Sequence, residues 1–186
     1  MGEIVRIGIT GLPNSGKTAT VLKVVESLKK EKYVVGGFIT PEIVEKGKRA
    51  GFKIVDLMNK KEGRLAHVKI KSRTKIGAYG VDKEALETIG VNALKQAMEK
   101  ADIVIIDEMA KMEMSSDLFC DTVRAILETD LPIIMTIHRK SRHPILQEIR
   151  RRTDIRMMEV TSVNKALMPY KIEKILKGRI ERRERE

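Results

Sequence analysis

Apolar residues follow two different spacings along this chain, and the first spacing predicts strands. Short runs that are apolar and often β-branched at nearly every position are typical of strands buried on both faces. The runs of this kind lie at residues 4–10, 34–40, 103–107, 133–137 and 157–161.

The second spacing predicts helices between and after these strands. Apolar residues recur there every three or four positions, which gives a helix one buried face. The predicted helices cover residues 19–30, 83–100, 117–129, 143–152 and 164–177. Asp82 precedes the second of them and Ser115 or Ser116 the third, where their side chains can cap the helix. Strands that alternate with helices predict a three-layer α/β/α fold with a mostly parallel sheet.

Residues 42–75 interrupt this alternation. Polar and apolar residues alternate at 42–45 and 51–57 around a turn that contains glycine, which predicts a half-exposed antiparallel hairpin. A short strand at 66–70 extends it, and a loop rich in glycine follows at 75–82. Such a hairpin insert makes either a mixed sheet or a small lobe over a ligand site.

The chain length of 186 residues predicts one domain rather than two. We assign residues 1–178 to this domain, with 42–75 as its insert. Residues 179–186 are almost all charged and predict a frayed helical tail.

The segment between the first strand and the first helix carries the clearest chemical signal. It matches G-x-x-x-x-G-K-[ST], the phosphate-binding loop, and strand, loop and helix follow in the order that this motif requires. The loop reads Gly11-Leu12-Pro13-Asn14-Ser15-Gly16-Lys17-Thr18. Its glycines allow backbone N–H groups to point at phosphate oxygens, and the helix adds its N-terminal donors. Lys17 suits the β- and γ-phosphates, and the Thr18 hydroxyl suits Mg²⁺. These residues predict a nucleoside phosphate ligand.

A pair of acids ends the third predicted strand. Ligands in sheets of this kind bind at the carboxyl ends of the strands, where Asp107 and Glu108 fall. Asp107 is expected to hold Mg²⁺ together with Thr18, and Glu108 has the position from which a carboxylate can activate the attacking water. A kinase would instead deliver the phosphoryl group to a bound acceptor, so that alternative stays open.

Other side chains on predicted loops or strand ends are weaker candidates. A second cation beside the transferred phosphate is expected on chemical grounds. The candidates for this cation are Arg49, Arg73, Lys111 and Arg142. Thr136 and His138, at the end of the strand 133–137, are candidates for sensing the γ-phosphate, and Tyr79 for stacking on a base.

The composition limits the expected cellular compartment and the classes of site and partner. The single cysteine, Cys120, excludes a disulfide within the chain and a metal site built from cysteines. The sequence has neither a signal peptide nor an apolar run long enough for a membrane span, so we expect a cytoplasmic protein without a membrane partner.

The formal net charge of +11 favours anionic partners, which means triphosphates or nucleic acid. Residues 42–75 hold 11 Lys and Arg against 4 acids, and residues 138–156 hold 7 against 2. Aromatic residues make up only 3%, which leaves few platforms for stacking bases. A nucleic-acid-binding ATPase therefore stays an alternative that the sequence does not favour.

Several segments in order resemble the thermophile-type nucleoside-triphosphatase family, which includes the human cancer-related nucleoside-triphosphatase. The resemblance extends to about Asn164, and the segments that carry it are 10–18, 37–42, 47–52, 76–82 and 107–114. It implies slow, Mg²⁺-dependent hydrolysis of ATP, GTP and other nucleoside triphosphates, with Glu108 as the base. We expect a monomer in which Lys17 and the loop hold the triphosphate.

The resemblance also implies features of the fold and of the site. It places the strand 133–137 between the strands 4–10 and 103–107. Besides residues 11–18, it assigns nucleotide binding to the segment Ile103-Val104-Ile105-Ile106-Asp107-Glu108-Met109-Ala110. This chain departs from the family pattern at Asn14-Ser15, at Ala110 and at Lys165.

Overall fold

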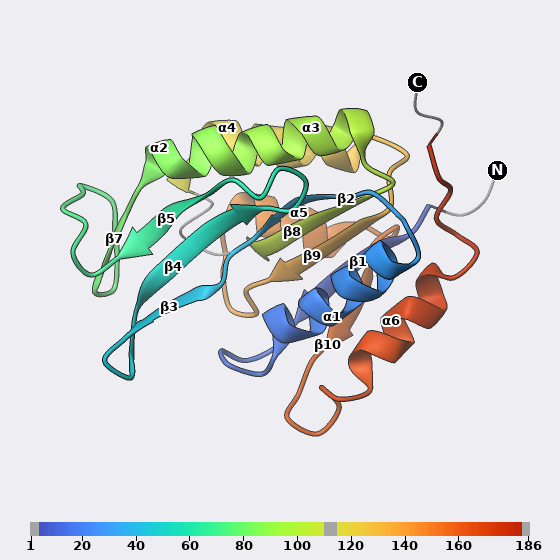
Figure 1. Cartoon of the computed structure of the whole chain (residues 1–186), viewed down its shortest axis with the longest axis horizontal. Helices are drawn as coiled ribbons and strands as arrows, with labels where there is room; N and C mark the ends of the chain where they lie inside the picture. The colour runs from blue at the N-terminus through green and yellow to red at the C-terminus, as the bar shows by residue number, and fades with distance from the viewer. Residues whose placement is uncertain (1–3, 110–114, 184–186) are drawn as a thin grey trace.

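The computed structural model describes residues 4–109 and 115–183, and its centre is one twisted sheet (Figure 1). The strands occur along the chain as β1 Arg6–Thr10, β2 Val35–Ile39, β3 Glu42–Glu45, β4 Lys48–Asp56, β5 Glu62–His67, β6 Lys75–Ile76, β7 Tyr79–Val81, β8 Ile103–Met109, β9 Ile133–Ile137 and β10 Arg156–Glu159. Across the sheet their order is β10-β1-β9-β8-β2-β4-β5-β7-β6, and β3 pairs with β4.

The sheet has a parallel half and an antiparallel half. β10, β1, β9, β8 and β2 run parallel, and β9 lies between β1 and β8 as predicted. β4 pairs antiparallel with β2, and β3, β5, β7 and β6 continue in antiparallel pairs. Residues 42–75 therefore extend the main sheet. Of the two predicted arrangements, the insert forms the mixed sheet and not a separate lobe.

Helices cover both faces of the sheet and complete the three layers. They are α1 Lys17–Lys30, α2 Lys83–Ala85, the π-helical turn η1 Leu86–Val91, α3 Asn92–Lys100, α4 Asp117–Leu127, α5 Pro144–Arg151 and α6 Met168–Leu176. The α1 and α6 helices pack on one face with Ile7, Ile9 and Ile105. On the other face, η1, α3, α4 and α5 pack on a larger core around Phe38 and Phe119, whose rings meet edge to face at 5.9 Å.

Local sequence signals set the starts of two helices, α2 and α4. The Ser116 side chain accepts a hydrogen bond from the Phe119 amide and caps α4, and Asp82 does the same for Ala85 at the start of α2. Both predicted caps are therefore confirmed, with Ser116 as the serine that is used.

Three expectations need correction. The segment 75–82 holds the short strand pair β6–β7, because backbone pairing to β5 compensates for the weak strand propensity of its glycines. The strand expected at 66–70 lies instead at 62–67, because its pairing with β4 fixes its position. The helix expected at 83–100 contains the π-helical turn at 86–91, which periodicity alone does not reveal.

The end of the chain packs back on the domain. Residues 180–183 are not helical, so the expected helical tail is wrong for this part. Ile180 is buried, Arg182 donates to the Glu31 carbonyl, and the Arg183 amide donates to Asp102. These contacts tie the segment to the carboxyl ends of α1 and α3, where helices leave carbonyls unpaired. The division between a domain of 1–178 and a tail of 179–186 stays a prediction.

In the part of the chain that the structure describes, no helix combines the length and the apolar character that crossing a bilayer requires. Cys120 is buried on α4, and burial raises the pKa of its thiol. The thiol therefore behaves as a small hydrophobic group, which suits its place beside Phe119.

Candidate active site

The loop between β1 and α1 has the geometry of a phosphate cradle. Asn14 and Gly16 take left-handed backbone conformations, with φ of 60° and 99°. Asn is among the few residues with a side chain that adopt this conformation readily, so Asn14 fits the turn. Gly16 precedes Lys17, the first residue of α1, and the unpaired N–H groups of the first helical turn thus face the loop.

Lys17 and Thr18 both stand on the first turn of α1, two residues earlier than the predicted start. The Lys17 Nζ donates to the carbonyl oxygens of Gly11 and Leu12, at 3.3 and 3.1 Å, and so lies across its own loop. The Thr18 hydroxyl points toward β8, where it donates to both carboxylate oxygens of Asp107 at 3.2 Å.

A bulge in β8 places the acid pair. The ladder between β8 and β9 shifts from Ile106 opposite Met135 to Met109 opposite Ile137, so Asp107 and Glu108 together oppose one residue. In a regular strand, two neighbouring side chains point to opposite faces. The irregularity allows Asp107 to reach Thr18 while Glu108 lines the same cavity as Thr18.

Hydrogen bonds fix the Asp107 carboxylate, which is fully buried. It accepts from the Thr136 hydroxyl at 2.8 Å and from the Thr40 amide at 3.2 Å, besides Thr18. Burial raises its pKa above the ordinary range, whereas these donors and the Lys17 charge act to lower it. A cation beside this carboxylate would favour its ionised form.

Burial also raises the pKa of Glu108, and the neighbouring Asp107 carboxylate adds to the increase. The charges of Lys17 and Arg49 act in the opposite direction. A carboxylate with a raised pKa is a better proton acceptor when ionised, which is the property that general-base chemistry requires.

These residues surround a cavity of about 350 Å³. Its walls come from the phosphate loop, from α1, from Glu108 and from the β3–β4 hairpin with the preceding Thr40. The lining residues are Pro13, Asn14, Gly16, Lys17, Thr18, Ala19, Thr40, Glu42, Arg49, Phe52 and Glu108. The arrangement combines phosphate donors, an oxygen pair for a metal ion and a carboxylate base.

Comparison with known proteins identifies the family. A family model described as NTPase matches residues 6–173. Nucleoside-triphosphatase THEP1 of Picrophilus torridus is 37% identical over 175 residues, which are 94% of this chain and 97% of that protein. Nucleoside-triphosphatase THEP1 of Methanocaldococcus jannaschii is 47% identical over 134 residues, 72% of this chain and 78% of that protein. The chain belongs to the THEP1 family of nucleoside-triphosphatases.

Solved structures agree with this assignment. The crystal structure of THEP1 from the hyperthermophile Aquifex aeolicus has a TM-score of 0.84 and 32% identity, covering 93% of this chain and 99% of that one. The solution structure of a human cancer-related nucleoside triphosphatase has a TM-score of 0.81 and 30% identity, covering 95% of this chain and all of that one. The THEP1-family chain is thus a phosphate-loop hydrolase, and the predicted fold class is confirmed.

Some predicted site residues of the THEP1-family chain lie away from the cavity. Residues 103–106 fill the interior of β8, and their side chains belong to the two cores. Gly11, Leu12 and Ser15 shape the loop without lining the cavity, and Met109 ends β8. Ala110 and Lys111 lie outside the described residues.

The weaker candidates from the sequence differ in whether they line the cavity. Arg49 lines the cavity, whereas Arg73, Arg142, His138 and Tyr79 are absent from its described walls. Tyr79 instead accepts a hydrogen bond from Arg49 at 3.2 Å. Thr136 contacts Asp107, so its position does not support the expected sensing of the γ-phosphate.

Sequence reasoning missed that Glu42 and Phe52 line the cavity, although alternation placed both on the hairpin. It also missed the position of Lys165. The side chain of Lys165 lies 3.6 Å from where a Cβ on Gly16 would stand, so the departure from the family pattern at Lys165 borders the phosphate loop.

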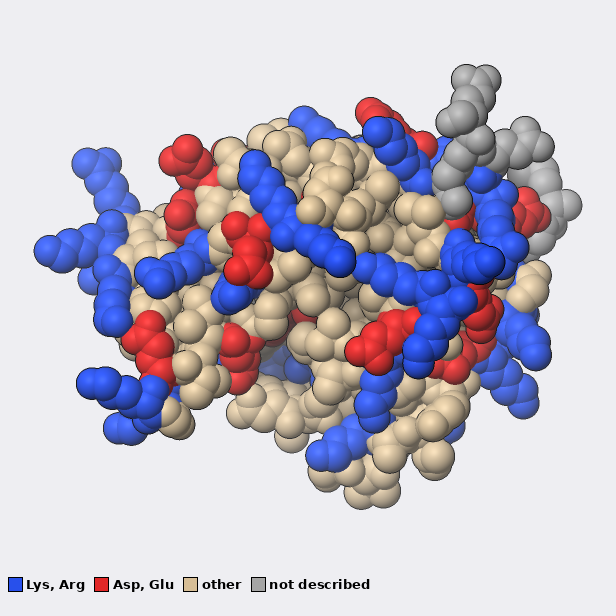
Figure 2. Space-filling view, viewed as in Figure 1, with Lys and Arg blue, Asp and Glu red and all other residues tan. Residues whose placement is uncertain are grey.

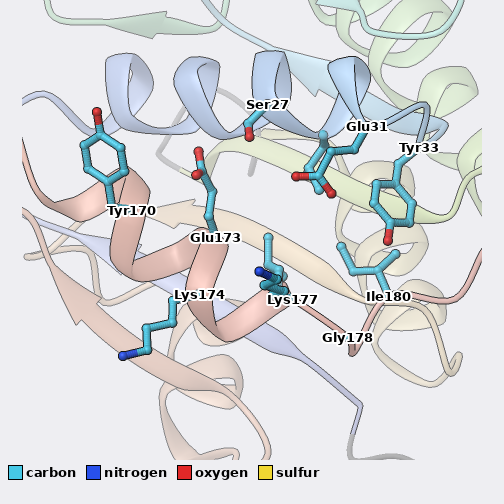
Figure 3. Close-up of a pocket in the computed structure, with 11 residues that line it drawn as sticks. Ser27, Glu31, Tyr33, Tyr170, Glu173, Lys174, Lys177, Gly178 and Ile180 are labelled. Atoms are coloured by element: carbon cyan, nitrogen blue, oxygen red, sulfur yellow. The ribbon is translucent and has the colours of Figure 1, made fainter.

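A second cavity, of about 380 Å³, lies between α1 and α6 (Figure 3). Ser27 of α1 and Glu31, just after the end of α1, lie across it from Glu173 of α6, and Tyr33 stands at one end. Of the described residues that line it, none belongs to the phosphate loop or to the acid pair. Since ligands of such sheets bind at the carboxyl ends of strands, this α1–α6 cavity is not the nucleotide site.

Lys and Arg side chains are spread over the visible face, with Asp and Glu among them (Figure 2). Several of the basic residues of the insert are paired with acids. Arg49 binds Glu42, Lys53 binds Glu62, and Lys69 binds Glu45. This mixture is typical of a solvated surface.

Proposed function

We propose that this nucleoside-triphosphatase hydrolyses ATP, GTP and other nucleoside triphosphates to the diphosphate and phosphate, with Mg²⁺ as the cofactor. One observation carries the proposal. Glu108 lines the cavity that Lys17 and Thr18 also line, beside the Asp107 carboxylate that binds Thr18. A nucleophile-activating base, a phosphate cation and a metal-binding oxygen pair are therefore in one place.

The donor set fits Mg²⁺. This ion prefers oxygen ligands and keeps several waters, so two protein oxygens and the phosphates suffice to hold it. The Thr18 hydroxyl and the Asp107 carboxylate supply two oxygens within 3.2 Å of each other. When bound, Mg²⁺ neutralises charge on the phosphate oxygens.

The residues of the chain divide the remaining work. Lys17 and the N–H groups of the loop bind the β- and γ-phosphates and hold the γ-phosphorus in line with a water. Glu108 accepts a proton from that water as its oxygen attacks, the bond to the β–γ bridging oxygen breaks, and the diphosphate leaves.

The lining of the cavity supports broad base specificity. The phosphate loop, Thr18 and Glu108 are suited to the phosphate end of the substrate. Binding energy at this end is the same for every nucleoside triphosphate, so we expect ATP, GTP and CTP to be hydrolysed at rates within about tenfold of each other.

The test is phosphate release from ATP, GTP and CTP with Mg²⁺, for the wild type and for Glu108→Gln. We expect release from all three by the wild type and a loss of about 10²-fold or more in the variant, with nucleotide still bound. Glu99→Gln is the matched control, because Glu99 is exposed on α3 and should leave the rate unchanged.

Each failure points to a different alternative. Release by the wild type only after a small-molecule acceptor is added would replace hydrolysis by phosphoryl transfer. Release only after RNA or DNA is added, with stimulation lost as salt rises, would indicate a nucleic-acid-dependent ATPase.

A further inference from the structure

The antiparallel hairpin reaches past the parallel strands at the edge where the phosphate loop lies. β2 pairs with β4 only at Val55 and Asp56, whereas the first part of β4, residues 48–52, pairs with β3. The β3–β4 hairpin thus projects beyond the end of β2 at its carboxyl edge (Figure 1). Three hairpin side chains, those of Glu42, Arg49 and Phe52, line the nucleotide cavity together with the phosphate loop.

Arg49 is held firmly at this place. Its Nη1 donates to Glu42 at 2.8 Å, and its Nε donates to the Tyr79 hydroxyl at 3.2 Å. Its guanidinium carbon lies 5.4 Å from the centre of the Phe52 ring, and Phe52 meets Tyr79 edge to face. These bonds use two of the five N–H donors that a guanidinium carries. The side chain is 39% exposed, so the group is fixed in direction and still open to the cavity.

The reaction requires charge stabilisation at this position. In phosphoryl transfer, negative charge on the transferred group and the bridging oxygen is stabilised by cations beyond the lysine of the loop. Arg49 lines the same cavity as Lys17 and Glu108, where the water would be activated, and the charge of Arg49 acts on the Glu108 carboxylate. Of the four cations that the sequence offers, Arg73 and Arg142 do not line the cavity, and Lys111 lies outside the described residues.

We propose that Arg49 is a catalytic residue that binds the γ-phosphoryl oxygens in the transition state, and that Glu42 and Tyr79 are positioning residues that aim its guanidinium. This inference rests on the proposed hydrolysis and adds to it a cation supplied by the chain itself. Because a guanidinium matches two phosphate oxygens at once, Lys is a poor replacement.

The experiment compares Arg49→Ala and Arg49→Lys with the wild type in two measurements. The first is steady-state phosphate release from ATP with Mg²⁺. The second is binding of ADP alone and of ADP with aluminium fluoride, which imitates the transferred phosphoryl group. Arg64→Ala is the matched control, since it removes the same charge from an exposed position on β5.

For Arg49→Ala we expect kcat to fall by about 10²-fold or more and the affinity for ADP to change little. The extra affinity that aluminium fluoride gives to ADP should be lost in the same variant, because it depends on the transition-state contact. Added guanidinium ion should restore part of the rate of Arg49→Ala. Arg49→Lys should stay well below the wild type, and Arg64→Ala should match the wild type in both measurements.

Tyr79→Phe tests the positioning role, since it keeps the ring against Phe52 and removes only the hydroxyl. We expect a fall in kcat of several-fold with KM for ATP unchanged, and no further loss when the change is combined with Arg49→Ala.

Wild-type turnover in Arg49→Ala, or undiminished binding of ADP with aluminium fluoride, would overturn the inference and leave the hydrolase intact. Absence of turnover in the wild type would instead contradict the proposed hydrolysis. If Arg49→Ala loses activity because it misfolds, guanidinium ion will not restore its rate and its thermal unfolding temperature will fall.

The affinity of Arg49→Lys for ADP with aluminium fluoride then tests the inference, and an affinity equal to that of the wild type counts against it.

Discussion

The two halves of the sheet differ in burial and in what each brings to the cavity. In the parallel half, β1, β8 and β9 are covered by helices on both faces, and β9 is buried at every position. In the antiparallel half, the residues of β3 alternate between exposed and half-buried, and β4 is exposed at the hairpin end. The parallel half supplies Asp107 and Glu108 from β8, whereas the antiparallel half supplies Glu42, Arg49 and Phe52.

This difference shows how one site divides between a rigid and an adaptable part. Groups that must keep their place during the reaction stand at the ends of fully packed strands, where a shift of one residue would disturb two cores. Side chains of the half-exposed hairpin are fixed by hydrogen bonds and ring contacts among themselves. We infer that the parallel half supplies the base and the metal ligand, and that the antiparallel half adds a cation for the transition state.

The largest expected effect is a loss of kcat/KM, and it is tested by comparing one lysine beside the parallel half with one lysine in the antiparallel half. Lys17→Ala removes the phosphate cation next to the parallel half, and we expect kcat/KM for ATP to fall by about 10³-fold. Lys53→Ala removes a charge from β4 that forms a half-exposed pair with Glu62, and its rate should stay within about twofold of the wild type. Similar losses in the two variants, measured by phosphate release, would contradict the different roles inferred for the two halves of the sheet.

Two glycines with left-handed backbones give the next effect, on stability. A Cβ at Gly37 of β2 would stand 2.0 Å from the Ile105 carbonyl oxygen, whereas one at Gly47 of the hairpin turn would meet nothing within 4 Å. We expect Gly37→Ala to lower the free energy of unfolding by about 3 kcal/mol or more, and Gly47→Ala by about 1 kcal/mol. Denaturant unfolding with unchanged m-values measures both, and equal costs would mean that the halves do not differ in rigidity.

A smaller effect is expected from a hydroxyl that acts through Asp107. Thr136→Val keeps the shape of the side chain and removes the donor at 2.8 Å from the carboxylate. The Mg²⁺ concentration for half-maximal rate should rise about tenfold, because partners behind a metal ligand orient it. Thr74→Val, near β6 in the antiparallel half, is the control and should leave that concentration unchanged. A Thr136→Val variant with wild-type Mg²⁺ dependence would show that Thr18 and Thr40 hold Asp107 sufficiently.

The smallest effect concerns a carboxylate just before β10, at the outer edge of the parallel half. Hydrogen bonding to Arg152 and the charge of Arg6 hold the pKa of Asp154 below its ordinary value. A lowered pKa gives stability that is present above the ordinary value and lost as pH falls through the folded-state pKa. Asp154→Asn should therefore cost less than about 1 kcal/mol at pH 7, and the difference from the wild type should shrink below pH 4. Unfolding curves at several pH values test this, and a difference independent of pH would assign the effect to packing.

The parts that sequence predicted are those whose information is local. The phosphate loop is a contiguous motif, and the acid pair follows a strand that its apolar run makes plain. The β8 bulge was not predictable, because it depends on pairing with β9. For the same reason, Arg49 was one of four equal candidates until the register of β4 placed it on the cavity wall. The packing of Arg182 and Arg183 was also hidden, since a charged segment gives no apolar signal for its contacts.

The edges of the sheet have a consequence for behaviour at high concentration. An exposed edge strand offers unpaired N–H and C=O groups to any other chain, and long flat edges lead to aggregation. Here the strands that pair on one side only are β10, β6 and β3, which are four, two and four residues long. Lysines at 69, 71 and 75 precede or begin β6. Strand addition between copies would gain few hydrogen bonds and would bring like charges together. We therefore expect copies of this chain not to join into intermolecular sheets when the protein is concentrated or heated.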